Sequence, residues 1–87
     1  MYERLLGKNA IVTGAARGMG FAIAKALYQE GARVALLDID EKGVSEAAQQ
    51  LDEKENRAIG RKIDVTHKGE IDGLVREVKK RWGSVDI

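Results

Sequence analysis

Short apolar segments alternate with helical patterns along the whole 87-residue chain. Three segments predict strands, and a fourth has the composition of a strand that is just beginning: residues 9–13, 33–38, 58–65 and 85–87. The second segment is an uninterrupted apolar run, which indicates a strand buried on both faces, as in a parallel sheet. Strands that alternate with helices predict parallel pairing through right-handed crossovers.

The segments between the predicted strands have the periodicity of amphipathic helices: residues 19–30, 41–53 and 67–82. The apolar stripe of the first helix is predicted to contain Met19, Ile23, Ala26 and Leu27. We expect Asp40 and Thr66 to cap the second and third helices. The predicted fold class is α/β, a Rossmann-type parallel sheet with helices on both faces in the order β-α-β-α-β-α-(β). This is an incomplete doubly wound fold, and residues 1–87 form the N-terminal part of a single domain.

A glycine-rich turn joins the first predicted strand to the first predicted helix. Because Gly14, Gly18 and Gly20 have no Cβ, the backbone there can approach a bulky anion. The following helix directs its free N–H groups and its positive dipole end at the same place, so the fitting ligand is a pyrophosphate. Three glycines can also simply make a turn. Asp38, 18 residues after Gly20, has the position of a ribose-binding carboxylate and favours a dinucleotide.

These residues resemble the short-chain dehydrogenases/reductases. The nucleotide motif of that family is Thr-Gly-x-x-x-Gly-x-Gly, and residues 13–20 match it at every fixed position. The segments around Asp38, Asp64–Val65 and 85–87 match the family as well. The resemblance implies a nicotinamide cofactor and hydride transfer between that cofactor and a small-molecule alcohol or carbonyl substrate.

The resemblance also implies eight cofactor-binding residues: Gly14, Arg17, Gly18, Met19, Gly20, Asp38, Asp64 and Val65. The glycines would shape the turn, and Arg17 and Met19 would contact the phosphates and the neighbouring ribose. Asp38 would accept both hydroxyls of the adenosine ribose. Asp64 and Val65 would form the adenine pocket. Apart from the resemblance, Asp64 is an ordinary strand-end residue, Val65 a core residue and Arg17 a solvated charge.

Two residues give opposite indications of which dinucleotide binds. Asp38 would repel the 2′-phosphate of NADP, which carries up to about two negative charges. Arg17 occupies a position at which NADP-using relatives often have a basic residue that meets this phosphate. Asp38 lies at the atom that distinguishes the two cofactors, so we predict NAD rather than NADP.

The catalytic residues of the family have no counterpart in this chain. They are a Ser and a Tyr-x-x-x-Lys pair with a supporting Asn, and neither Tyr2 nor Tyr28 has a Lys four residues later. We therefore predict no catalytic residues and no metal site here, and an inactive chain that forms the nucleotide-binding part of a parent enzyme. Two alternatives are a non-catalytic dinucleotide-binding or sensing module and a structural fragment. His67 is expected to be structural or exposed, and Trp82 to belong to the core.

Composition limits the partners and the location of the protein. The 15 Lys and Arg residues nearly balance the 14 Asp and Glu residues, which argues against nucleic acid or a membrane surface as a charge-driven partner. No apolar run approaches the ~20 residues that span a bilayer. The absence of Cys fits a reducing compartment and predicts a cytoplasmic protein. If these residues were the entire polypeptide, the first strand would be an exposed edge, and we would expect a homo-oligomer or marginal stability.

Overall fold

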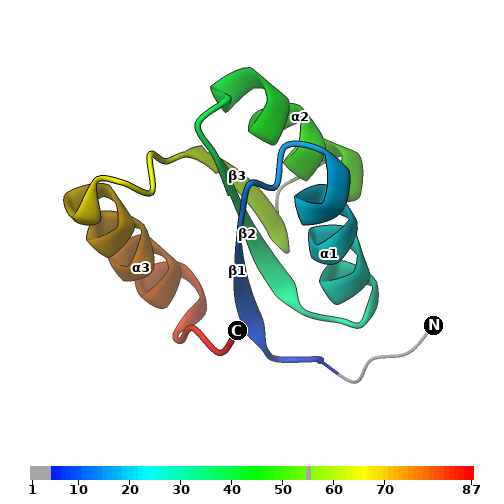
Figure 1. The fold of residues 1–87 in the computed structure, drawn as a ribbon. Coiled ribbons are helices and arrows are strands. Elements are labelled where there is room, and N and C mark those ends of the chain that lie inside the picture. Colours follow the sequence, from blue (N-terminus) through cyan, green and yellow to red (C-terminus); the bar gives the residue numbers. More distant parts are fainter. Residues whose placement is uncertain (1–4, 55) are drawn as a thin grey trace.

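The structure of the chain, a computed structural model, describes residues 5–54 and 56–87; Tyr2 lies outside them. The elements follow one another in the predicted order (Figure 1): β1 (Asn9–Thr13), α1 (Gly18–Gln29), β2 (Arg33–Asp38), α2 (Glu41–Leu51), β3 (Ala58–Lys62) and α3 (Lys68–Trp82). Within the described residues the strands form one parallel sheet in the order β1-β2-β3. Its register places Ile11 opposite Ala35 and Ala35 opposite Ile59.

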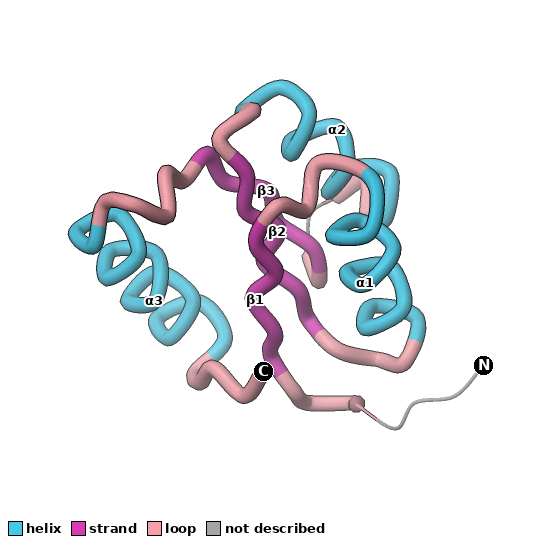
Figure 2. The backbone as a smooth tube through the Cα atoms, in the orientation of Figure 1, coloured by secondary structure: helices cyan, strands magenta, loops and turns pink. Residues whose placement is uncertain are grey.

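Helices cover both faces of this sheet, as Figures 1 and 2 show. On one face, α1 and α2 pack over a core that includes Val34, Leu36 and Val44. On the other face, α3 packs over a core that includes Ala35 and Leu37. Successive residues of β2 therefore point into opposite cores, which explains why this strand is apolar without interruption. The predicted α/β fold with helices on both faces is confirmed.

The buried face of α1 includes Leu27 of the predicted stripe but not Met19, Ile23 or Ala26. Met19 is 80% exposed and Ile23 is 46% exposed, whereas Ala24 is fully buried. The half-buried side chains that pack beside Ala24 are Phe21, Leu27 and Tyr28. The prediction was wrong for Met19 and Ile23, because the fully buried position of the helix is the small residue Ala24 and bulky apolar side chains do not by themselves mark the buried face.

Several element boundaries and one cap also differ from prediction: α1 spans Gly18–Gln29 rather than residues 19–30, and α3 begins at Lys68 rather than at residue 67. The strand β3 ends at Lys62 rather than at residue 65, and beyond this end Ile63 and Val65 line a cavity at the end of the sheet. The helix α2 ends at Leu51 rather than at residue 53. Thr66 does not cap α3: its N–H and its hydroxyl both donate to Asp64 Oδ1, at 2.9 and 2.6 Å, and this turn precedes the helix. The expected cap at Asp40 is confirmed, since its Oδ1 accepts from the Gly43 N–H at 3.0 Å.

The C-terminal residues pair with the free side of β1. The Ile87 N–H donates to the Asn9 carbonyl at 3.1 Å, and the Ile11 N–H donates to the Ile87 carbonyl at 3.0 Å, which is the bonding pattern of a parallel ladder. The predicted start of a fourth strand therefore lies beside β1. The resulting order β3-β2-β1 followed by residues 85–87 is the order of one half of a doubly wound sheet and the start of the other.

A buried asparagine joins this C-terminal segment to the sheet. Asn9 is 1% exposed, and its Nδ2 donates to the Ser84 carbonyl at 3.0 Å and to the Trp82 carbonyl at 3.4 Å. Its Oδ1 accepts from Arg33 Nε at 2.7 Å. Trp82, expected in the core, is half-buried, and its ring centroid lies 5.8 Å from the Arg33 guanidinium carbon.

Two kinds of feature are absent from the part of the chain that the structure describes. None of its helices is long and apolar enough to cross a membrane, and the longest, α3, has 15 residues. In the same ranges, no group of three or more His, Cys, Asp or Glu side chains is arranged to hold a metal ion.

Candidate functional site

A cavity of about 300 Å³ opens at the carboxyl end of the sheet, which is where parallel α/β proteins bind ligands. It is lined by Thr13, Gly14, Leu37, Asp38, Ile39, Ile63, Asp64 and Val65. It thus brings together four of the eight predicted site residues, from the ends of three strands. Its walls are mostly apolar with two carboxylates, a composition that suits a flat, partly polar ring.

The three glycines of the turn are required for different reasons. Gly14 and Gly18 have φ angles of 61° and 64°, a left-handed conformation that favours glycine. Nothing lies within 4 Å of a Cβ added at either position, so the outer side of the turn is open. A Cβ at Gly20 would instead overlap the Gly14 carbonyl group, 2.7 Å from its carbon. Gly20 therefore allows the first turn of α1 to lie directly against the glycine-rich turn.

The N-terminus of α1 has no side-chain cap. Arg17 is the N-cap residue, and its side chain makes no capping hydrogen bond. The first turn of α1 contains no acidic residue. Main-chain N–H groups at such an end lack intrahelical partners, and with the helix dipole they favour an anion. The open turn in front of them could therefore hold a pyrophosphate.

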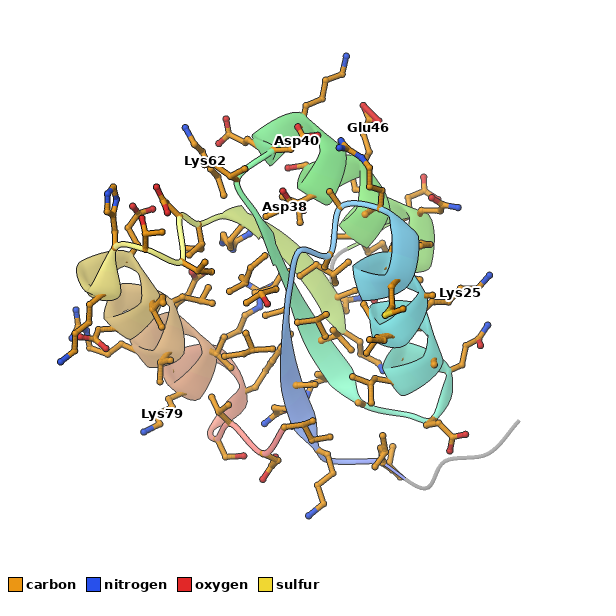
Figure 3. All side chains as sticks on the ribbon, in the orientation of Figure 1. Lys25, Asp38, Asp40, Glu46, Lys62 and Lys79 are labelled. Carbon is orange, nitrogen blue, oxygen red and sulfur yellow. The ribbon has the colours of Figure 1, made fainter. Side chains whose placement is uncertain are left out.

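The Asp38 carboxylate links the end of β2 to the glycine-rich turn. Its Oδ2 accepts from the Ala16 N–H at 3.1 Å, and its Oδ1 accepts from the Asp40 N–H at 3.0 Å. Figure 3 shows Asp38 and Asp40 together where β2 ends and α2 begins. Each carboxylate oxygen can accept more than one hydrogen bond, so Asp38 retains the capacity to accept two hydroxyl groups.

Arg17 forms a contact that the sequence analysis missed. Its Nη2 pairs with Asp40 Oδ2, although the two residues are 23 positions apart. The Gly43 N–H, with a further contribution from Arg17, holds the pKa of the Asp40 carboxyl below its ordinary value. A Cβ at Gly43 would lie 2.9 Å from Asp40 Cγ, so the capping carboxylate occupies space that only glycine leaves free. The sequence predicted Asp40 as a helix cap and showed Arg17 as a basic residue of the turn. Neither observation indicates that the two side chains pair.

The remaining predicted residues, Asp64, Val65 and Met19, lie on two sides of the turn, and Ile39, which was not predicted, joins Val65 at the cavity. Val65 and Ile39, at the cavity, are 52% and 63% exposed. Asp64 faces the same cavity, and its hydrogen bonds from the Thr66 hydroxyl and N–H lower the pKa of its carboxyl. Met19 lies on the first turn of α1, outside the cavity lining. The structure therefore places all eight residues around the carboxyl end of the sheet.

His67, beside Asp64, is expected to titrate above its ordinary pKa of 6.5. Its Nδ1 lies 2.8 Å from Glu70 Oε2, and this hydrogen bond, followed by the charge of Asp64, raises its pKa. Its contribution to stability is thus complete below pH 6.5 and is lost as the pH rises through the folded-state pKa. In an NMR titration, Glu70→Gln should lower this pKa toward 6.5. An unchanged pKa in the variant would contradict the assignment to Glu70.

The family model described as short chain dehydrogenase matches residues 8–87. The chain belongs to the short-chain dehydrogenase family. It is 44% identical over 84 residues to "Sorbitol dehydrogenase" of Cereibacter sphaeroides, covering 97% of this chain and 32% of that protein. It is 41% identical over 80 residues to "NAD-dependent glycerol dehydrogenase" of Listeria innocua serovar 6a, covering 92% of this chain and 30% of that protein.

A solved structure confirms the short-chain dehydrogenase fold. The crystal structure of "Short-chain dehydrogenase/reductase SDR:Glucose/ribitol dehydrogenase" from Brucella melitensis superposes with a TM-score of 0.89 at 28% identity. The match covers 99% of this chain and 36% of that one. The chain therefore spans about a third of the length of the short-chain dehydrogenases that it matches.

Proposed function

We propose that the protein carrying this chain is an oxidoreductase that transfers hydride between NAD and an alcohol or carbonyl group. In this proposal residues 1–87 belong to one dinucleotide-binding domain and supply its nucleotide-binding part. The supporting observation is the Asp38 carboxylate, which is bonded to the glycine-rich turn and lines the cavity at the end of the sheet. The nicotinamide ring supplies the hydride chemistry when the cofactor is bound.

Each group of residues has a separate role in binding. Asp38 accepts the two hydroxyls of the adenosine ribose. The exposed apolar side chains of Ile39 and Val65 would hold the adenine ring, and Asp64 would accept from its exocyclic amine. The pyrophosphate lies over the turn that Gly14, Gly18 and Gly20 shape, at the N-terminus of α1. Met19 borders the neighbouring ribose.

The substrate class is proposed from the relatives. The names of two relatives, sorbitol dehydrogenase and NAD-dependent glycerol dehydrogenase, favour a small polyol or its carbonyl product. We assign proton transfer to residues of the full-length protein outside these 87, because this chain contains no Tyr-x-x-x-Lys pair. The cytoplasmic location and the homo-oligomeric state stay predictions.

Cofactor choice tests the proposal directly. We expect kcat/KM of the full-length protein, measured with a panel that includes sorbitol and glycerol, to be about tenfold or more higher with NAD than with NADP, because Asp38 favours hydroxyls over a phosphate. Calorimetry with NAD provides a measurement that does not depend on knowing the substrate. A preference for NADP would contradict the role of Asp38. NAD binding without turnover on any alcohol or carbonyl compound would favour a sensing module.

A further inference from the structure

We propose that Asp40 is a second cofactor-selectivity residue, which acts by holding the Arg17 guanidinium away from the 2′-phosphate of NADP. This inference rests on the proposed function, because it assumes that Asp38 binds the adenosine ribose. It makes Asp40 a positioning residue: Asp40 acts on the cofactor through Arg17 and without touching it.

The first step is the place of the pair beside the ribose position. The Asp38 carboxylate accepts from the main chain on two sides: from Ala16, the residue before Arg17, and from Asp40 itself. Both members of the pair are therefore anchored next to the carboxylate that would hold the ribose hydroxyls. A phosphate on the 2′-hydroxyl would enter the region that Arg17 and Asp40 share.

The second step is the fixed orientation of Asp40. Its Oδ1 is bonded to the Gly43 N–H at 3.0 Å as the cap of α2, which leaves Oδ2 for Arg17. The absence of a Cβ at Gly43 provides the space that this carboxylate occupies, and a Cβ there would also lie 3.2 Å from Arg17 Nη2. Helix capping and the hold on Arg17 therefore depend on the same side-chain position.

The third step is the small contribution of this pair to folding. The Arg17 and Asp40 side chains are 75% and 36% exposed, and exposed ion pairs add little to stability. A guanidinium is nevertheless the side chain best shaped to bind phosphate oxygens. While the Arg17 guanidinium is paired with Asp40, a 2′-phosphate that enters this region meets two carboxylates, Asp38 and Asp40, and a guanidinium that already has a partner. The Arg17–Asp40 pair therefore acts against NADP binding although it adds little to the stability of the fold.

The test is Asp40→Asn in the full-length protein, with Kd for NAD and NADP measured by calorimetry. Asn is as good an N-cap as Asp, so the bond from Gly43 is kept while the charge that holds Arg17 is removed. We expect the ratio of Kd for NADP to Kd for NAD to fall about tenfold, the effect of one charge-assisted hydrogen bond. Adding Arg17→Gln should reverse most of this fall, because the freed guanidinium is then absent; the remainder reflects the lost charge of Asp40.

Two further variants keep the result interpretable. Glu41→Gln removes the same charge from the next, exposed residue of α2, and should leave the ratio nearly unchanged. Arg17→Gln alone should also leave the ratio unchanged, because in the wild type the guanidinium does not serve the phosphate. An equal change in Glu41→Gln, or a tenfold rise of the ratio in Arg17→Gln alone, would overturn the inference.

Different results would overturn the proposed function and the role of Asp40. A wild-type protein that binds neither dinucleotide overturns the proposed function, and this inference with it. A wild-type protein that binds NAD, with an unchanged ratio in Asp40→Asn, overturns only the role of Asp40. If Asp40→Asn does not fold, as judged by circular dichroism, Asp40→Ser takes its place, because Ser is also a good N-cap and carries no charge; the same fall of the ratio is expected, and an unchanged ratio overturns the inference.

Discussion

Replacing Gly20 with alanine is expected to weaken NAD binding by the full-length protein about 100-fold, which corresponds to about 2.7 kcal/mol. The new Cβ would overlap the Gly14 carbonyl group, 2.7 Å from its carbon. Both groups belong to the backbone, so neither can move aside as a flexible side chain would. The N-terminus of α1 must instead move away from the turn, and the donors that would face the pyrophosphate are lost. Calorimetry with NAD measures the effect.

Two glycines of the same chain serve as controls for this result. Gly69, in the first turn of α3, is exposed and has nothing within 4 Å of an added Cβ, so Gly69→Ala should bind NAD as the wild type does. Gly18→Ala meets no atom but keeps a strained φ of 64°, so its loss should be smaller than that of Gly20→Ala. A folded Gly20→Ala protein with wild-type affinity would show that the dinucleotide binds elsewhere.

Asp38→Ser is expected to lower kcat/KM with NAD by roughly 10- to 150-fold, the loss of about 1.5–3 kcal/mol of charge-assisted hydrogen bonding. Ser has one oxygen where the carboxylate has two, so it cannot accept from the Ala16 and Asp40 N–H groups and from two ribose hydroxyls together. With NADP the same substitution removes a repulsive charge. The ratio of kcat/KM for the two cofactors should therefore move toward NADP.

Asp52 provides the matched control for Asp38→Ser. Its carboxylate also accepts from main-chain N–H groups, from Arg57 at 2.8 Å and from Lys54 at 3.2 Å, but it lies at the opposite end of α2. Asp52→Ser should leave the ratio of kcat/KM for NAD and NADP unchanged. Its effect on folding should be comparable with that of Asp38→Ser. If Asp38→Ser leaves the ratio unchanged as well, Asp38 does not select the cofactor.

The order of the elements was predictable because it depends on local patterns. The apolar run of β2 is a property of neighbouring residues, and so is the glycine that follows α1 and α3: Gly31 and Gly83 have φ angles of 102° and 98°. The orientation of α1 was not predictable, because its fully buried position, Ala24, is too small to stand out in an apolar pattern. The end of β3 was predicted too late because Val65 lines a cavity, and a cavity wall has the same composition as a core.

The candidate site was predictable at positions where the surrounding sequence pattern leaves a residue type only one chemical role. The glycines of the turn and Asp38 at the strand end are such cases, and the structure places them together, although their binding roles stay predictions. The pairing of Arg17 with Asp40 was not predictable, because it joins a turn and a helix cap that are distant in sequence. For the same reason the sequence does not indicate that position 43 requires glycine, which follows from the position of the Asp40 carboxylate.

The buried amide of Asn9 has a consequence for the order in which the chain folds. Its donors are satisfied by Trp82 and Ser84, which are 73 and 75 residues later. Contacts of such separation close late, because the entropy of the intervening loop is lost before they form. During synthesis β1 is made first but must wait for the end of α3 to emerge from the ribosome before its buried asparagine is fully bonded. Early pairing of β1 with β2 therefore leaves the Asn9 amide without these acceptors until the end of α3 arrives beside it.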